Sequence, residues 1–235
     1  MTDTADDTPE VWFTVNLQSA GNISRMHLYP RGTEATPEAG AYRRGERFKV
    51  TDLELALADG TTKEGAAFAR ICPDFQITQE GAAVTSKKLH DLLVQFDMGN
   101  NHLVECRFMD WERKVYRPER FWIISIAEQK AGLDLDAMPI GSPFEEGPNR
   151  TVLPSSNVLY PSPHNPEFYF YNVAMNNHNG GGLALKSHVT QGADLWRDPR
   201  TRDDIFYFSD RLKRAIDGAK LRLRMGPRFF PVVLT

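Results

Sequence analysis

Two segments of the sequence carry the same order of helix and strand signals, and this order constrains the fold more than any other feature. They are TSKKLHDLLVQFDMGNNHLVECRFM, which begins at Thr85, and FSDRLKRAIDGAKLRLRMGPRFFPVV, which begins at Phe208. Each has a serine suited to a helix N-cap, a leucine three residues later, a helical stretch, a glycine and an apolar strand. We therefore expect each half of the chain to contribute a cap–helix–strand unit to a mixed architecture.

The first predicted helix covers Ser86–Asp97, with Ser86 as its N-cap. Its apolar residues recur at helical spacing and form one stripe; they are Leu89, Leu92, Leu93 and Phe96. The MGNN sequence that follows ends the helix, with Gly99 or Asn100 suited to a left-handed residue. The second helix is predicted after Ser209, with Leu212, Ala215 and Ile216 facing inward and Arg211, Lys213 and Arg214 outside that stripe.

Runs rich in β-branched, aromatic or alternating apolar residues predict the strands. These runs are 11–17, 24–30, 47–60, 102–109, 120–128, 167–173, 183–189, 205–209 and 228–234. Proline and glycine punctuate residues 132–166, which predicts a long loop or crossing. We expect an acidic disordered tail over 1–10 and one α+β domain over 11–235, with a mixed or antiparallel sheet, a few flanking helices, and lobes at 11–131 and 167–235.

Composition limits the kinds of partner. With 28 basic and 31 acidic residues among 235, the chain has a formal net charge of −3, which argues against a general field for nucleic acid. Cys72 and Cys106 lack metal-ligand spacing, and two cysteines in a chain of this size indicate a reducing compartment. No export signal or membrane-spanning run is recognisable, so we expect a cytoplasmic protein that does not bind membranes.

Signals for catalysis are weak. The carboxylate pairs Glu145-Glu146 and Asp203-Asp204 are adjacent in sequence, which predicts solvated charge and not a shared acid–base cleft. Ser209 follows a strand and opens a helix, but the Gly-x-Ser-x-Gly motif of a nucleophile elbow is absent, so a helix cap is favoured. We expect no enzyme and no cofactor. The alternative is a small hydrolase or metal-dependent enzyme that uses His164, His178 or His188.

Basic residues cluster near the C-terminus. The cluster consists of Arg211, Lys213, Arg214, Lys220, Arg222, Arg224 and Arg228. In an extended KLRLRM segment, Arg222 and Arg224 share one face, opposite the leucines. This pattern is typical of a charged edge strand, which blocks unwanted pairing. A contact patch for an acidic partner, nucleic-acid binding and self-assembly into a homo-oligomer through this edge are the other hypotheses.

The C-terminal segment also resembles a known family. Its elements are Trp196-Arg197, the strand Ile205–Phe208, Ser209-Asp210, Leu212 and Phe230-Pro231-Val232. This order resembles the C-terminal signature of a bacterial immunity-protein family, family eleven of the polymorphic-toxin immunity proteins. The resemblance covers Thr85 to the end, and the chain departs from the family in a longer and more basic link before the last strand.

Membership of that family would imply a non-enzymatic cytoplasmic protein that binds and neutralises a cognate toxin, such as an effector delivered by type VI secretion. We expect such binding to depend on a few arginine or aromatic anchors within a polar rim. The candidate contact residues are Arg211, Arg214, Arg222 and Arg224.

Overall fold

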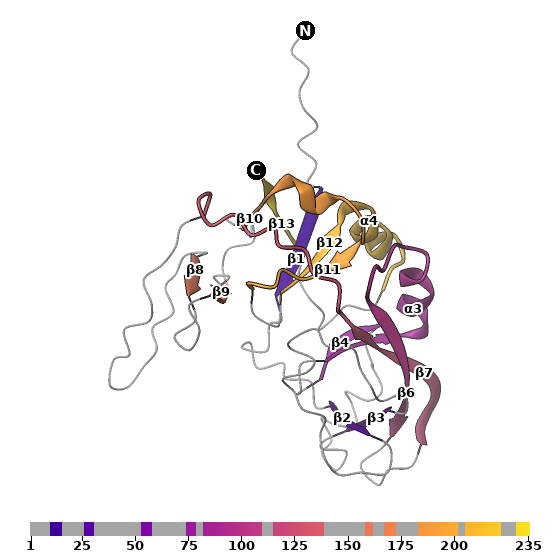
Figure 1. The fold of residues 1–235 in the computed structure, drawn as a ribbon. Helices are drawn as coiled ribbons and strands as arrows, with labels where there is room; N and C mark the ends of the chain where they lie inside the picture. Colours follow the sequence, from indigo (N-terminus) through magenta and orange to yellow (C-terminus); the bar gives the residue numbers. More distant parts are fainter. Residues whose placement is uncertain are drawn as a thin grey trace, which may run out of the picture.

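A computed structural model of the chain describes residues 10–15, 26–30, 53–57, 74–78, 82–109, 115–138, 158–161, 167–172, 183–201, 205–221 and 229–235. Within these residues, mixed and antiparallel sheets combine with two α-helices (Figure 1), so the fold is α+β, as the sequence predicts. Among the predicted elements, the tail over 1–9 and most of the KLRLRM segment lie outside the described residues.

Helix α3 (Lys87–Leu93) begins where the sequence predicts. Ser86 is its N-cap, and the serine Oγ accepts a hydrogen bond from the Leu89 N–H at 3.4 Å. The helix ends before the predicted Asp97, because the N–H groups of Gln95 and of the next residue bond three residues back, not four. Such bonds tighten and terminate an α-helix.

Helix α4 (Asp210–Gly218) directly follows its strand, as predicted. Ser209 is the N-cap, and its Oγ accepts a hydrogen bond from the Leu212 N–H at 3.2 Å. Leu212 and Ile216 are buried on the inner face. After the helix, Lys220 adopts a left-handed conformation with φ 50°, which ends the helical path.

A four-stranded antiparallel sheet unites the two ends of the described chain. Its order is β11 (Leu195–Trp196), β12 (Ile205–Ser209), β1 (Val11–Val15) and β13 (Phe229–Pro231). β1 thus lies between strands from the C-terminal region. Sequence order places β1 in the first lobe, yet its sheet partners belong to the second.

A six-stranded sheet holds most of the other strands. Its order is β2 (Met26–Pro30), β3 (Leu53–Leu57), β6 (His102–Met109), β7 (Val115–Ser125), β5 (Ala83–Ser86) and β4 (Phe75–Ile77). β3 and β6 are parallel, and every other neighbouring pair is antiparallel. The sheet is therefore mixed.

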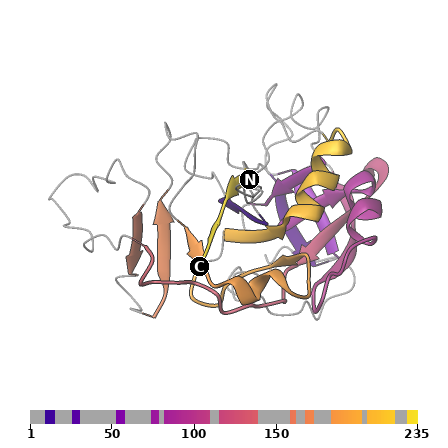
Figure 2. The same cartoon turned by 90° about the horizontal axis from the view of Figure 1, so that it is seen from above.

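The segment predicted as a proline-rich loop contains a strand. β8 (Val158–Pro161) pairs antiparallel with β9 (Tyr169–Asn172), and this ribbon lies on the side of the molecule away from the helices (Figures 1 and 2). Pro161 is tolerated because it occupies the strand end in a two-stranded ribbon. The start of the segment is also structured, since Gly132 and Leu133 both donate backbone hydrogen bonds to Asp198 Oδ2 at 2.7 Å.

Two other predicted strands are broken up. The run over 183–189 forms only β10 (Ala184–Leu185), followed by the 3₁₀-helix η2 (Ser187–Thr190). The run over 228–234 splits into β13 and β14 (Val233–Leu234), and β14 pairs parallel with β10. The split occurs because Val232 donates its N–H to Val11 on β1, whereas the next residue donates to Leu183, so the chain passes from one sheet to another.

The two sheets contain the same four-stranded arrangement. The order β4-β5-β7-β6 in the larger sheet matches β11-β12-β1-β13, and all neighbouring strands are antiparallel in both. In each set, the second strand runs through a serine cap into a helix that leads to the fourth strand. We call the set that contains α3 the first unit and the set that contains α4 the second unit.

The register also agrees between the two units. The residue before the serine cap lies opposite a tryptophan of the third strand: Thr85 opposite Trp122, and Phe208 opposite Trp12. The chain order differs, because β7 follows β6 directly, whereas β1 precedes everything else in the second unit. The units are thus related by a circular permutation, and the sequence repeat reflects a repeat of structure.

The helices of the two units pack against each other (Figure 1). Leu89 and Leu93 of α3 join Leu212 and Ile216 of α4 in one hydrophobic cluster. Residues from both units also line a small apolar cavity of about 20 Å³, which is room for roughly one water molecule. A second cluster, with Phe13, Trp196 and Tyr207 among its members, fills the other side of the four-stranded sheet.

Candidate functional site

A buried carboxylate lies where the two units meet. Asp194 comes directly before β11, and its side chain is 1% exposed. It accepts hydrogen bonds from Ser209 Oγ in the second unit and from the backbone N–H of Asp97 in the first, the latter at 2.9 Å. Because a buried carboxylate is costly without donors and a counter-charge, these bonds alone leave its charge unbalanced.

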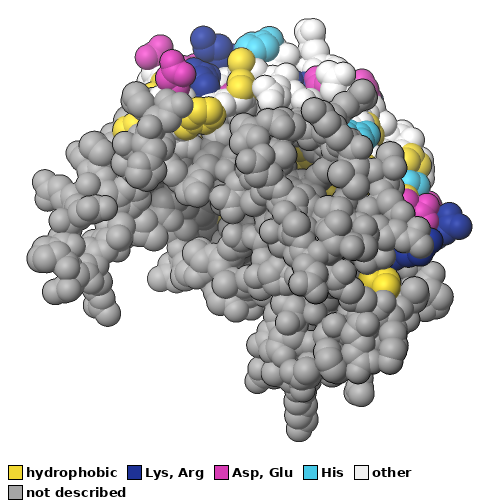
Figure 3. Space-filling model, turned by 60° about the horizontal axis from the view of Figure 1, so that its bottom comes forward, with side chains coloured by type: hydrophobic (Ala, Val, Ile, Leu, Met, Phe, Trp, Pro, Cys, Tyr) yellow, Lys and Arg dark blue, Asp and Glu magenta, His cyan; other side chains and the backbone are white. Residues whose placement is uncertain are grey.

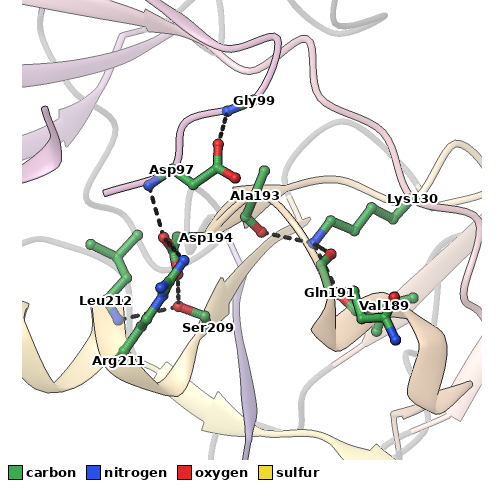
Figure 4. A network of polar contacts seen from close by, with 10 residues as sticks. All are labelled: Asp97, Gly99, Lys130, Val189, Gln191, Ala193, Asp194, Ser209, Arg211 and Leu212. Carbon is green, nitrogen blue, oxygen red and sulfur yellow. Dashed lines mark hydrogen bonds and ion pairs between the residues drawn. The ribbon is translucent and has the colours of Figure 1, made fainter. Parts of the chain in front are cut away.

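Arg211 supplies the counter-charge. Its Nε donates to Asp194 Oδ1 and its Nη2 to Oδ2 at 2.7 Å, a two-point contact along one side of the guanidinium (Figure 4). Hydrogen bonding to Asp194 raises the pKa of the Arg211 guanidinium above its ordinary value. The Arg211 side chain nevertheless stays 64% exposed, so one group connects a buried anchor to the surface.

The loop after α3 makes this junction possible. Gly99 has φ +53°, as the MGNN sequence predicts, and its N–H bonds to Asp97 Oδ1 at 2.9 Å. A Cβ at this glycine would lie 2.7 Å from Glu128 Oε2 and 2.8 Å from Ala193 Cβ. Glycine is therefore required both for the backbone conformation and for the close approach to the segment that carries Asp194.

The position equivalent to Arg211 in the first unit is a lysine, not an arginine. Lys88 occupies the same place in α3, two residues after the serine cap, and donates to the Lys220 carbonyl at 3.2 Å. Positive charge in the first turn of a helix also opposes the helix dipole. Both units therefore carry a basic residue here, but only the second has an arginine that holds a buried aspartate at two points and stays exposed, which makes Arg211 a candidate for a functional role.

Arg214 lies three residues after Arg211, so the two arginines share a face of α4. Arg214 Nε pairs with Asp210 Oδ2 at 2.6 Å, and Asp210 Oδ1 accepts a hydrogen bond from Trp12 Nε1 at 3.0 Å. The Arg214 side chain is 63% exposed. We call Arg211 and Arg214 the α4 arginine pair; each is held by a carboxylate that is itself anchored.

Lys130 fixes the segment that precedes Asp194. Its Nζ donates to three backbone carbonyls at 2.7 to 2.9 Å (Figure 4); they belong to Val189, Gln191 and Ala193. The same ammonium lies 3.9 Å from the centroid of the Trp196 ring. Burial lowers the pKa of Lys130, although the nearby carboxylates of Glu128 and Asp194 act in the opposite direction.

Charges of both signs are mixed around the arginine pair. On α4, Lys213 pairs with Asp217 at 2.5 Å and lies over the Trp12 ring at 4.2 Å. Mixed charge is not confined to α4: on the face drawn in Figure 3, whose residues are not labelled, described lysine and arginine side chains also lie beside aspartate and glutamate. This arrangement suits a few discrete charged contacts better than a long-range field of one sign.

The structure brings together two of the four predicted contact residues, Arg211 and Arg214. Arg222 and Arg224 lie outside the described residues. Sequence patterns gave no prediction for Asp194, the residue that orients Arg211. A signal for it exists, because an aspartate directly precedes the edge strands β4 and β11, in PDF at Asp74 and in ADL at Asp194, and bonds to the serine cap in both units.

The histidines proposed for a metal site are only partly described. His188 is exposed on η2, with Nε2 3.1 Å from the Ala131 carbonyl oxygen. His164 and His178 lie outside the described residues. Where the structure describes the chain, no three histidine, cysteine, aspartate or glutamate side chains gather as metal ligands. Cys106 is buried on β6, and Cys72 is another residue not described.

No protein-family model matches this sequence, and no curated protein matches it either. Within the described residues, neither α3 nor α4 has the length and apolar character needed to cross a bilayer. Evidence for the function of the chain must therefore come from its own residues.

Proposed function

We propose that this chain is an immunity protein, which binds a cognate bacterial toxin in the cytoplasm and neutralises it by direct contact. The resemblance of the C-terminal segment to the immunity family supports this proposal. The residues that carry the resemblance are largely buried in the second unit, including Trp196, Leu212 and Phe230. They define a framework, so the surface that meets a toxin must be sought among exposed residues.

The observation that carries the proposal is the α4 arginine pair. Interface hot spots are enriched in arginine, and an anchor that is already ordered loses less conformational entropy on binding. Arg211 and Arg214 meet both conditions, because each is more than 60% exposed and yet held by an aspartate. Their positions on one short helix also give the two charges a fixed spacing.

Co-expression in bacteria tests the proposal. The probe is the C-terminal domain of a secreted multidomain protein whose gene is sought beside the gene of this chain, and it is produced with and without the chain. We expect the chain to restore growth and to co-elute with the toxin domain in size-exclusion chromatography. Failure to restore growth when both proteins are soluble would contradict the proposal.

Light scattering of the purified chain addresses self-assembly. A scaffold protein would form large oligomers without any partner, whereas an immunity protein should gain mass only when the toxin domain is added. Turnover of a small compound by the pure chain would also contradict a function by binding alone.

A further inference from the structure

The Arg211 guanidinium has N–H donors that Asp194 does not use. A guanidinium has five N–H donors in one plane, and these form two edges that can each hold a carboxylate. Asp194 occupies the edge made by Nε and Nη2. Of the remaining donors, one hydrogen of Nη1 and one of Nη2 form the second edge, and the other Nη1 hydrogen lies on the Cδ side.

The second edge is available at the surface. The Arg211 side chain is 64% exposed, and no further group among the described residues bonds to it. The Asp194 carboxylate is fixed in position, because it also accepts hydrogen bonds from Ser209 in one unit and from the Asp97 backbone in the other. It therefore restricts the movement of the Arg211 guanidinium. The plane of the guanidinium is therefore set by the protein interior.

We propose that this second edge binds a carboxylate of the toxin, with Asp194 as the positioning residue that orients Arg211. This inference rests on the proposed function and specifies the chemistry of the partner at one point. A planar, pre-oriented fork matches a carboxylate at two points, whereas a lysine ammonium offers only a point charge. Arg214, three residues further along α4, adds a second cation for an acidic surface around that carboxylate.

A polyanion fits this surface less well. Phosphate backbones bind to extended arrays of positive charge. Here Asp210 and Asp217 flank the basic residues of α4, and the charge of the Asp97 carboxylate acts on Arg211 across the unit junction. A single guanidinium edge that is surrounded by charges of both signs suits one carboxylate of a protein better than a row of phosphates.

Affinity for the same toxin domain, measured by calorimetry, tests the inference. Arg211→Lys keeps a positive charge beside Asp194 but loses the two-point contact and the second edge. At a temperature where circular dichroism shows the variant to be folded, we expect about tenfold weaker binding or more. The matched control is Arg120→Lys, an arginine on β7 that is 68% exposed and pairs with Glu105 at 3.4 Å. It should bind like the unaltered chain.

The outcomes separate the inference from the proposed function. If the unaltered chain does not bind the toxin domain, the proposed function fails. If the chain binds and Arg211→Lys binds equally well, only the inference fails. An equal loss of affinity in Arg120→Lys would also overturn it, because the effect would then not depend on the orientation of Arg211.

Asp194→Asn tests the positioning role at a temperature where circular dichroism shows the variant to be folded. We expect affinity to fall as in Arg211→Lys, together with loss of the slowly exchanging Nε–H resonance of Arg211 in ¹⁵N NMR. A purely structural aspartate would lower the melting temperature and leave the affinity of the folded protein unchanged.

A single-stranded oligonucleotide serves as the competing probe at about 0.15 M salt, where weak surface attraction is screened. We expect no binding that depends on Arg211. Binding that Arg211→Lys abolishes would overturn the assignment of the second edge to a protein carboxylate.

Discussion

Ser86 and Ser209 occupy equivalent positions in the two units, and each connects a helix to an aspartate. Each Oγ accepts a hydrogen bond from the first turn of its helix and donates one to an aspartate Oδ1, at 2.6 Å for Asp74. Each serine N–H also bonds to the carbonyl of the same aspartate, Asp74 or Asp194, at 2.9 Å. The cap and the strand pairing therefore reinforce each other in both units.

Loss of either cap should destabilise the chain. We expect Ser86→Ala and Ser209→Ala each to lower the free energy of unfolding by about 1–2 kcal/mol, because each removes a cap acceptor and a donor to an aspartate. Urea denaturation measures the change. Ser187→Ala, at the exposed start of η2, is the control and should change stability by less than about 0.5 kcal/mol. Unchanged stability in both cap variants would contradict the role assigned to them.

Asp194→Asn should cost more than a change at an exposed aspartate. The substitution replaces a buried acceptor of charge-assisted bonds, so we expect a loss of about 2–3 kcal/mol in the free energy of unfolding. Asp217→Asn, at a 51% exposed aspartate in a surface ion pair with Lys213, should cost less than about 1 kcal/mol. Equal costs at the two positions would show that burial of the Asp194 carboxylate has no energetic consequence.

Lys130→Met should loosen the segment before Asp194. The variant loses three hydrogen bonds to backbone carbonyls, and we expect about 1–2 kcal/mol lower stability. Amide hydrogen exchange should become faster over residues 187–193. Lys186→Met, at an exposed lysine outside this contact, is the matched control and should leave exchange there unchanged.

Lys130 should also affect stability at alkaline pH. Burial lowers the pKa of its ammonium below the ordinary value of 10.5, so the folded chain releases this proton at a lower pH than the unfolded chain does. Between those two pKa values the unfolded state binds more protons, and the contribution of Lys130 to the free energy of unfolding rises with pH. Lys130→Met should lack this rise, and ¹³Cε NMR titration should show Lys130 deprotonating below the ordinary lysine pKa of 10.5.

The cavity between the helices offers a test of the structural repeat. Phe75 and Leu195 both line it and occupy equivalent positions, each directly after the aspartate of its unit. We expect Phe75→Leu to enlarge the cavity and cost about 1 kcal/mol. Leu195→Phe, which copies the first unit, should fill space and cause no loss of stability in thermal unfolding. A cost of about 3 kcal/mol for Leu195→Phe would mean that the site is already fully packed.

Local signals in the sequence predict much of the secondary structure. Ser86 and Ser209 mark both helix starts, since a cap depends on a serine and the few residues after it. β6 and β12 match their predicted bounds, because alternating or continuous apolar runs identify strands within a short window. The end of α3 is less well predicted, because its last turn tightens where Phe96 joins the core.

Two of the four predicted contact residues, Arg211 and Arg214, could be grouped from sequence, because helical spacing alone puts them on one face. Asp194 could not be grouped with them from sequence, since its role depends on donors from both units, and one of these, the Asp97 N–H, is distant in the chain. The same limit explains why β8 was missed, because its pairing with β9 depends on residues across a proline-rich segment.

The helix caps, the inward faces of the helices and the repeat of one cap–helix–strand unit follow from the amino-acid sequence, because capping and periodicity depend on residues that are neighbours in the chain. The place of β1 in the second unit and the contact of Asp194 with Arg211 become evident only in the folded chain. Sheet order depends on pairing between distant residues, such as Trp12 opposite Phe208, nearly 200 positions apart. The buried Asp194 carboxylate likewise depends on a donor about 100 positions away, the Asp97 N–H.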